Sequence, residues 1–142
     1  MPEKALVIVP TFNERDNIIR LIDAVLQQDP RLEVLVVDDG SPDGTGDLVA
    51  ERSLGDHRVH LLGRPRKMGL GTAYVAGFRW ALARDYEFVF EMDADFSHDP
   101  SHLPQFLASI VDADLVLGSR YREGKVTVVN WPMARLILSY SA

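Results

Sequence analysis

Cysteine is absent from this chain of 142 residues, which removes disulfide bonds, thiolate metal sites and cysteine nucleophiles together. No apolar run approaches the roughly 18 residues that a membrane-spanning helix requires. The first residues, Met1 to Lys4, lead directly into an apolar segment, so we expect no secretory signal. Positive charge is scarce, since 15 Lys and Arg face 21 Asp and Glu, and the net charge of −6 argues against a nucleic-acid partner. These absences favour a cytoplasmic protein.

The length and composition fit a single globular domain, which we expect to span residues 1–142. Near its end, the segment 131–140 predicts an apolar helix with Asn130 as its N-cap and Pro132 in its first turn. The chain stops at Ala142 with neither a helix cap nor a polar tail. We therefore expect a domain that is truncated at its C-terminus.

Short apolar runs alternate with longer helical patterns along the chain. The runs predict buried strands at Ala5–Val9, Glu33–Val37, Val59–Leu62, Phe88–Met92 and Leu115–Leu117. Apolar residues at helical spacing predict helices around Ile18–Val25, Gly46–Arg52, Gly71–Arg84 and Leu103–Ile110, the last behind Asp99 as N-cap and Pro100. Alternating strands and helices predict an α/β fold whose mainly parallel sheet is covered on both faces.

Polar residues follow four of the predicted strands. The clusters are Pro10–Glu14, Asp38–Ser41, Asp93–Asp95 and Gly118–Arg120. Ligands of open α/β sheets bind beyond the carboxyl ends of the strands, and all four clusters fall on that edge. The sequence thus concentrates its chemistry in one place.

The triplet Asp93-Ala94-Asp95 has the pattern of a metal site. Two carboxylates at i and i+2 after a strand can share one hard cation, and the small Ala94 lets a ligand approach. Mg²⁺ and Mn²⁺ are commonly held by one or two carboxylates together with substrate phosphates. A solvated acidic turn has the same residues, but the position behind the strand Phe88–Met92 favours the metal.

The acidic residues nearer the N-terminus are less specific. Asp-Gly is a turn signal that accounts for one acid of the pair Asp38 and Asp39, and the other could accept hydrogen bonds from a base or a ribose. Glu14 either complements the positive end of the following helix or contacts a nucleoside. We expect Asn13 to cap that helix and His98 to be a helix-entry residue.

Two groups of cations suit an anion. Gly69-Leu70-Gly71 precedes a helix and follows Arg64, Arg66 and Lys67, which is similar to a phosphate-binding loop but lacks the full glycine fingerprint. The second group is a solvated loop or an anion site, because arginine matches phosphate bidentately, and consists of Arg120, Arg122, Lys125 and Arg135.

In order and spacing, three segments resemble the inverting family-2 glycosyltransferases of the GT-A fold: Val9–Glu14, Val37–Thr45 and Glu91–His98. Three more resemble the polyprenol-phosphate (dolichol-phosphate) mannosyltransferases within that family: Ser41–Thr45, Gly69–Tyr74 and Gly118–Tyr121. The resemblance covers essentially the whole chain. It implies a GT-A, Rossmann-like three-layer sandwich.

The resemblance also implies roles for individual residues. The nucleotide sugar would be bound by Pro10, Phe12, Glu14, Val37, Asp39, Gly69, Asp93, Ala94, Asp95 and Arg120. Asp93 and Asp95 would hold Mg²⁺ or Mn²⁺, and Asp95 and Arg120 would be the catalytic residues. Phe12 stands where the subgroup often has Tyr, and Ser97 where some relatives carry Gln near the metal.

The implied reaction is the inverting transfer of a hexose, with mannose from GDP-mannose favoured, to a polyprenyl or dolichyl monophosphate. A lipid monophosphate is largely ionised at neutral pH, so it needs no general base but needs cations. Arg120, Arg122 and Arg135 would supply them. We expect a cytoplasmic protein, peripheral at the cytoplasmic face of a membrane and held there by the membrane surface or a membrane-anchored partner.

Three alternatives stay open. The first is a family-2 enzyme that uses another nucleotide sugar or a hydroxyl acceptor. The second is a donor-binding fragment without turnover. The third is a receiver-type signalling domain, suggested by Asp38 and Asp39, but its third strand would end in an Asp where this chain has Leu62-Gly63.

Overall fold

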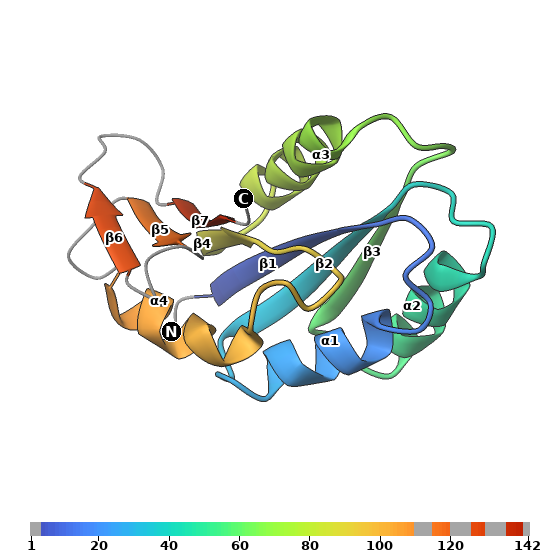
Figure 1. The fold of residues 1–142 in the computed structure, drawn as a ribbon. Coiled ribbons are helices and arrows are strands. Elements are labelled where there is room, and N and C mark those ends of the chain that lie inside the picture. The colour runs from blue at the N-terminus through green and yellow to red at the C-terminus, as the bar shows by residue number, and fades with distance from the viewer. Residues whose placement is uncertain (1–3, 110–114, 120–125, 130–135, 141–142) are drawn as a thin grey trace.

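A computed structural model describes the backbone of residues 4–109, 115–119, 126–129 and 136–140, and the side chains of residues 4–108. Strands and helices alternate in the order expected from the sequence (Figure 1). The elements are β1 (Lys4–Thr11), α1 (Ile18–Leu26), β2 (Leu32–Asp38), α2 (Thr45–Leu54), β3 (Val59–Gly63), α3 (Leu70–Leu82), β4 (Tyr86–Glu91), the 3₁₀ turn η1 (Pro100–His102), α4 (Leu103–Ser109), β5 (Leu115–Ser119), β6 (Val126–Val129) and β7 (Leu136–Tyr140).

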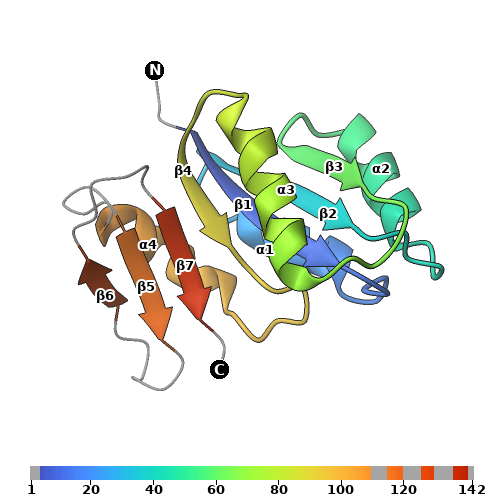
Figure 2. The same cartoon turned by 90° about the horizontal axis from the view of Figure 1, so that it is seen from above.

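The described strands form one seven-stranded sheet in the order β3-β2-β1-β4-β7-β5-β6. All neighbouring strands are parallel except β5 and β6, as the arrows in Figure 2 show. Thr11 at the end of β1 lies opposite Asp38 at the end of β2, and the backbone N–H of Met92 donates to the carbonyl of Ile8. The carboxyl ends of β1, β2 and β4 therefore meet at one edge.

The central strand β1 is buried on both faces, which explains its uninterrupted apolar sequence. Ala5, Val7 and Val9 contribute to the core beneath α1, α2 and α4. Leu6 and Ile8 contribute to the core beneath α3. Figure 1 shows α3 alone on one side of the sheet and the other helices on the opposite side. The expected three-layer α/β sandwich with a mainly parallel sheet is confirmed.

Helix α3 packs unusually close to the sheet. Its buried positions are Ala73, Gly77 and Ala81, which recur every four residues along one face. A Cβ atom added at Gly77 would lie 2.6 Å from Cγ2 of Ile8, so a larger residue there would have to displace the Ile8 side chain. This close packing fixes the position of the whole helix, including the residues that it directs at the carboxyl edge.

Near the C-terminus the structure differs from the sequence prediction. The helix expected over residues 131–140 is wrong, because Leu136–Tyr140 forms strand β7 between β4 and β5. The Leu-Ile-Leu run is compatible with either element, and pairing with both neighbouring strands decides for a strand. The predicted cap Asn130 and Pro132 lie outside the described residues. Strand β6, at Val126–Val129, was not predicted.

Candidate active site

The first acid of the pair after β2 has a structural role. Asp38 is buried, and its carboxylate accepts hydrogen bonds from Thr11 Oγ1 at 2.7 Å, Ser41 Oγ at 2.6 Å and the Ser41 backbone N–H at 3.1 Å. These bonds tie the end of β1 to the turn after β2. Asp38 is therefore the acid of the pair that has a purely structural role, since its side chain bonds the backbone and side chains of the turn.

The second acid, Asp39, is paired with a cation that the sequence analysis assigned to a phosphate loop. Arg64 donates from Nε to Asp39 Oδ1 at 2.6 Å and from Nη2 to Oδ2 at 2.7 Å. The side chains are 10% and 8% exposed, and the pairing raises the pKa of Arg64. Asp39 directly follows β2 and Arg64 directly follows β3, which is the parallel neighbour of β2. Their positions after neighbouring strands are the feature of the sequence that could have predicted this ion pair.

A third hydrogen bond extends the Asp39–Arg64 pair to α3. Arg64 Nη1 donates to Thr72 Oγ1 at 3.1 Å, and Thr72 donates to the backbone carbonyls of Met68 and Gly69 at 2.8 Å. Gly69 has a φ of 98°, a conformation that favours glycine, and begins this helix. The structure thus uses Arg64 to connect the β2 turn with the start of α3.

The loop after β1 is bonded to the Ser41–Thr45 turn. Asn13 does not cap α1, which begins at Ile18; it has a φ of 55°, its N–H donates to Ser41 Oγ at 2.9 Å, and its Oδ1 accepts from the Asp43 N–H at 3.3 Å. The Glu14 N–H donates to Thr45 Oγ1 at 3.0 Å. The expectation of an Asn13 cap is wrong, because contacts about 30 residues away in sequence determine its conformation.

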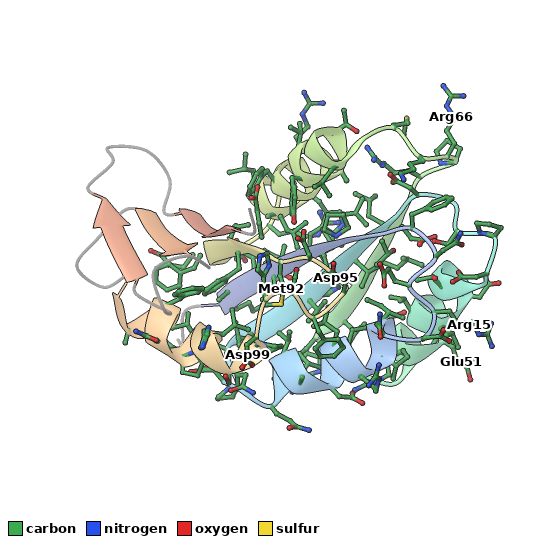
Figure 3. All side chains as sticks on the ribbon, in the orientation of Figure 1. Arg15, Glu51, Arg66, Met92, Asp95 and Asp99 are labelled. Atoms are coloured by element: carbon green, nitrogen blue, oxygen red, sulfur yellow. The ribbon has the colours of Figure 1, made fainter. Side chains whose placement is uncertain are left out.

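Several predicted nucleoside-binding residues lie at this edge, and one does not present its side chain there. Phe12 is 37% exposed, with Lys67 Nζ 5.1 Å from its ring centroid. Glu14 follows Phe12 two residues later, and its carboxylate accepts a hydrogen bond from Asn17 Nδ2 at 3.2 Å. Pro10 is half-buried, whereas Val37 is fully buried in the core beneath α3. Arg66 points away from the domain (Figure 3).

The Asp93-Ala94-Asp95 triplet forms the loop that follows β4, where Figure 3 labels Asp95. Asp93 accepts from the Tyr74 hydroxyl at 3.2 Å and, more weakly, from Ser97 Oγ at 3.5 Å. Asp95 is exposed, and its Oδ1 accepts from the Ser97 N–H at 2.9 Å. Hydrogen bonds from Ser97 hold the pKa of Asp95 below its ordinary value, so Asp95 is ionised at neutral pH.

His98 stabilises the same loop. It is buried, and its Nδ1 accepts a hydrogen bond from the Asp93 backbone N–H at 3.2 Å. Asp99 caps η1 by accepting from the Ser101 N–H at 2.9 Å, as predicted. His98 therefore shapes the backbone of the triplet, and the expectation of a helix-entry residue is confirmed in that it directly precedes the cap.

Negative charge accumulates at the end of β4. Burial, and the proximity of Asp93, raise the pKa of Glu91 to about 7. Burial and the neighbouring carboxylates also raise the pKa of Tyr74, so its hydroxyl remains a donor at neutral pH. Such a group of carboxylates favours binding of a cation.

The donor set fits a magnesium or manganese ion. Among the described residues there is no group of three or more His, Cys, Asp or Glu side chains that could hold a metal on its own. Two carboxylates, Asp93 and Asp95, instead offer hard oxygen ligands and leave the remaining coordination positions to phosphates and water, as Mg²⁺ sites commonly do. This chemistry suits a cation that is bound together with a diphosphate.

The predicted acceptor-phosphate residues Arg120, Arg122 and Arg135 lie outside the described residues. Strand β5 ends at Ser119, directly before Arg120, and is parallel to β7, which is parallel to β4. Gly118 and Ser119, the described residues of the fourth polar cluster, thus lie at the same edge of the sheet as the other three clusters.

The fold and this edge define the class of protein, a GT-A glycosyltransferase domain. The solved structure of the mannosyltransferase PcManGT from Pyrobaculum calidifontis, in complex with GDP-Man and Mn²⁺, matches with a TM-score of 0.68 and 26% identity over 83% of this chain and 35% of that chain. The family model of Glycosyl transferase family 2 matches residues 6–141, and the chain belongs to this family.

Two relatives are similar in sequence over nearly the whole chain. A polyprenol monophosphomannose synthase from Mycolicibacterium smegmatis is 51% identical over 99% of this chain and 53% of the relative. An undecaprenyl-phosphate mannosyltransferase from Micrococcus luteus is 47% identical over 97% of this chain and 56% of the relative. The chain thus spans about half the length of these relatives.

Proposed function

We propose that residues 1–142 form the nucleotide-sugar-binding catalytic domain of an inverting, metal-dependent mannosyltransferase that transfers mannose from GDP-mannose to a polyprenyl monophosphate. The observation that carries this proposal is the position of Asp93 and Asp95 at the end of β4, on the same edge as the Asp39–Arg64 pair and Phe12. A nucleoside diphosphate has its base at one end and its charged phosphates at the other. The edge offers an exposed aromatic ring for the base and carboxylates for a phosphate-bound cation.

The likeness to relatives supports the choice of substrates. The relatives' names specify mannose and a polyprenyl phosphate, and the solved mannosyltransferase binds GDP-Man and Mn²⁺. We infer the same donor, the same acceptor class and a divalent cation, Mg²⁺ or Mn²⁺, for this chain. Its contacts with the nucleotide sugar would come from the predicted residues among those described, including Pro10, Gly69 and Ala94; Val37 is fully buried and would only support the strand end beneath them.

In the proposed mechanism, Asp93 and Asp95 would hold the cation that accompanies the diphosphate. When bound, this ion supplies Lewis-acid stabilisation of the charge on the departing nucleoside diphosphate. Ser97 keeps the carboxylate of Asp95 oriented and ionised for that task. Phe12 and the Asp39–Arg64 pair orient the nucleoside, so that the anomeric carbon faces the acceptor.

The acceptor needs cations rather than a base. A lipid monophosphate is already a nucleophile at neutral pH, since its second pKa is about 6. We propose that Arg120, Arg122 and Arg135 neutralise and orient it, and that Arg120 also faces the donor phosphates. Attack from the face opposite the leaving group would invert the anomeric centre.

A lipid acceptor implies action at a membrane. None of the helices in the described ranges is both long and apolar enough to cross a bilayer. From the lipid nature of the proposed acceptor, we propose a peripheral location at the cytoplasmic face, reached through the membrane surface or a membrane-anchored partner.

Calorimetric titration tests the donor site. GDP and UDP, each with and without Mn²⁺, are titrated into the wild-type chain and into the Asp93→Ala/Asp95→Ala variant. We expect GDP to bind in a Mn²⁺-dependent manner to the wild type and without Mn²⁺ dependence, or not at all, to the variant. If only UDP bound in a metal-dependent manner, the donor would be a UDP-sugar and not GDP-mannose. If neither nucleotide bound, the proposed donor site would be refuted.

A second assay tests the reaction. The wild-type chain is incubated with GDP-mannose, Mn²⁺ and a polyprenyl monophosphate, and the mannosyl lipid is extracted into organic solvent and quantified. Product that disappears in the Asp93→Ala/Asp95→Ala variant supports turnover. Tight donor binding without product would instead identify the chain as the donor-binding part of the enzyme.

A further inference from the structure

Tyr74, on α3, contacts a carboxylate of the β4 loop. Its hydroxyl donates to Asp93 Oδ1 at 3.2 Å, across 19 residues of sequence. We propose that Tyr74 is a positioning residue that holds the Asp93 carboxylate in the orientation required to bind the divalent cation. This inference rests on the proposed function, in which Asp93 is a metal ligand.

The ring of Tyr74 is held firmly enough to have this effect. It is partly buried against the core formed by Leu6, Ile8, Leu35 and Val37. Its neighbour Ala73 is buried, and Gly77, one turn further on, brings α3 into contact with Ile8. Because α3 is closely packed on the sheet, the hydroxyl has a defined position relative to the end of β4.

An aspartate at the start of a loop needs such a partner. The terminal torsion of an Asp side chain is broad, so the carboxylate turns freely unless its oxygens are bonded. Of the two hydroxyls bonded to Asp93, that of Tyr74, at 3.2 Å, is nearer than that of Ser97, at 3.5 Å, and therefore restricts the carboxylate more. Hydrogen-bonding partners of metal ligands fix ligand orientation, and their loss typically weakens metal binding 10- to 100-fold.

The same helix also connects to the predicted nucleoside end of the site. Thr72, two residues before Tyr74, accepts from Arg64 Nη1, and Arg64 holds Asp39. Helix α3 therefore carries one contact to the Asp39–Arg64 pair and one to Asp93. The same helix therefore supports both the proposed metal ligand, through Tyr74, and the proposed nucleoside-binding pair, through Thr72.

A purely structural role would give a different result, and the chain offers a matched control. Tyr86 is also partly buried, and its hydroxyl donates to the carboxylate of Glu33 at 2.7 Å. Glu33 lies near the start of β2 and Tyr86 at the start of β4, at the opposite edge of the sheet. Tyr74→Phe and Tyr86→Phe each remove one hydroxyl-carboxylate bond, but only the first touches a proposed metal ligand.

The experiment measures Mn²⁺ binding directly. Free Mn²⁺ is quantified by electron paramagnetic resonance during titration of wild type, Tyr74→Phe and Tyr86→Phe in the presence of saturating GDP, with thermal unfolding as a check on folding. We expect Tyr74→Phe to raise the Kd for Mn²⁺ about tenfold and Tyr86→Phe to change it less than twofold. The affinity for GDP without metal should be the same in all three proteins.

Two results overturn the inference. Equal Mn²⁺ affinity in Tyr74→Phe and wild type would show that the hydroxyl does not position Asp93. Equal losses in Tyr74→Phe and Tyr86→Phe would show a general effect on stability. Both outcomes leave the proposed function intact if the wild type binds Mn²⁺ and loses it in Asp93→Ala/Asp95→Ala; a wild type that binds no Mn²⁺ would refute the proposed function, and this inference with it.

Discussion

The substitution Arg64→Met would leave the Asp39 carboxylate buried without its guanidinium partner. Both side chains are at most 10% exposed, so water can replace little of the lost interaction. Removing one partner of a buried ion pair costs about 3–5 kcal/mol. Because the pair lies at the edge of the sheet, we expect the free energy of unfolding to fall by about 3 kcal/mol, the lower end of that range. Urea unfolding followed by far-ultraviolet circular dichroism measures the loss.

A second ion pair in the same chain isolates the effect of burial. Arg31 donates to Asp29 with similar bidentate geometry, from Nε at 3.0 Å and Nη2 at 2.9 Å, but the side chains are 34% and 18% exposed. Arg31→Met should therefore cost less than about 1 kcal/mol. The double variant Asp39→Leu/Arg64→Met, which leaves no buried charge, should regain most of the stability lost in Arg64→Met.

Two outcomes would refute this reasoning about desolvation. One is an equal cost for Arg64→Met and Arg31→Met, since that would make burial irrelevant. The other is a double variant that is no more stable than Arg64→Met, because the cost would then come from lost packing of the arginine side chain. The slope of unfolding free energy against urea should be unchanged throughout, as expected when only stability changes.

Three further predictions follow from other contacts. Gly77→Val should lower the free energy of unfolding by about 2 kcal/mol, because its side chain must displace Ile8; a variant as stable as wild type in thermal unfolding would contradict the close packing of α3. Asp56 has its pKa held below the ordinary 3.8, chiefly by the backbone N–H of Arg58, so it stabilises the fold above that pH and loses the effect as the pH falls through the lowered pKa. The difference in unfolding free energy between wild type and Asp56→Asn should shrink from about pH 5 to about pH 2, and a pH-independent difference would argue against this assignment. Phe12→Ala should weaken Mn²⁺-dependent GDP binding about tenfold in calorimetry through lost stacking, and an unchanged Kd would place the base elsewhere.

The sequence predicted the strands and most helices because buried parallel strands carry uninterrupted apolar runs. The predicted Ala5–Val9 and Glu33–Val37 lie wholly within β1 and β2. Leu136–Tyr140 was misassigned because a short apolar run satisfies both periodicities, and its two partner strands lie elsewhere in the sequence. A segment's own apolar pattern determined its secondary structure where that pattern was unambiguous. Where it was ambiguous, as in Leu136–Tyr140, pairing with distant strands determined it.

In the candidate site, the edge was predictable and the partners were not. Asp93 and Asp95 lie where the strand pattern placed them. The bonds from Arg64 to Asp39 and from Tyr74 to Asp93 span 25 and 19 residues, and no local signal specifies which side chains meet over such separations. The roles assigned to the site residues remain predictions that the proposed experiments test.

The position of β7 has a consequence for the order in which the chain folds. Strands β3, β2, β1 and β4 are neighbours and are complete once residue 91 has been synthesised. Strand β5 reaches this block only through β7, which ends at Tyr140. We therefore expect the first four strands to fold while the chain is still emerging from the ribosome, and the β5–β6 hairpin to wait, with its edge unpaired, until β7 arrives to separate it from β4.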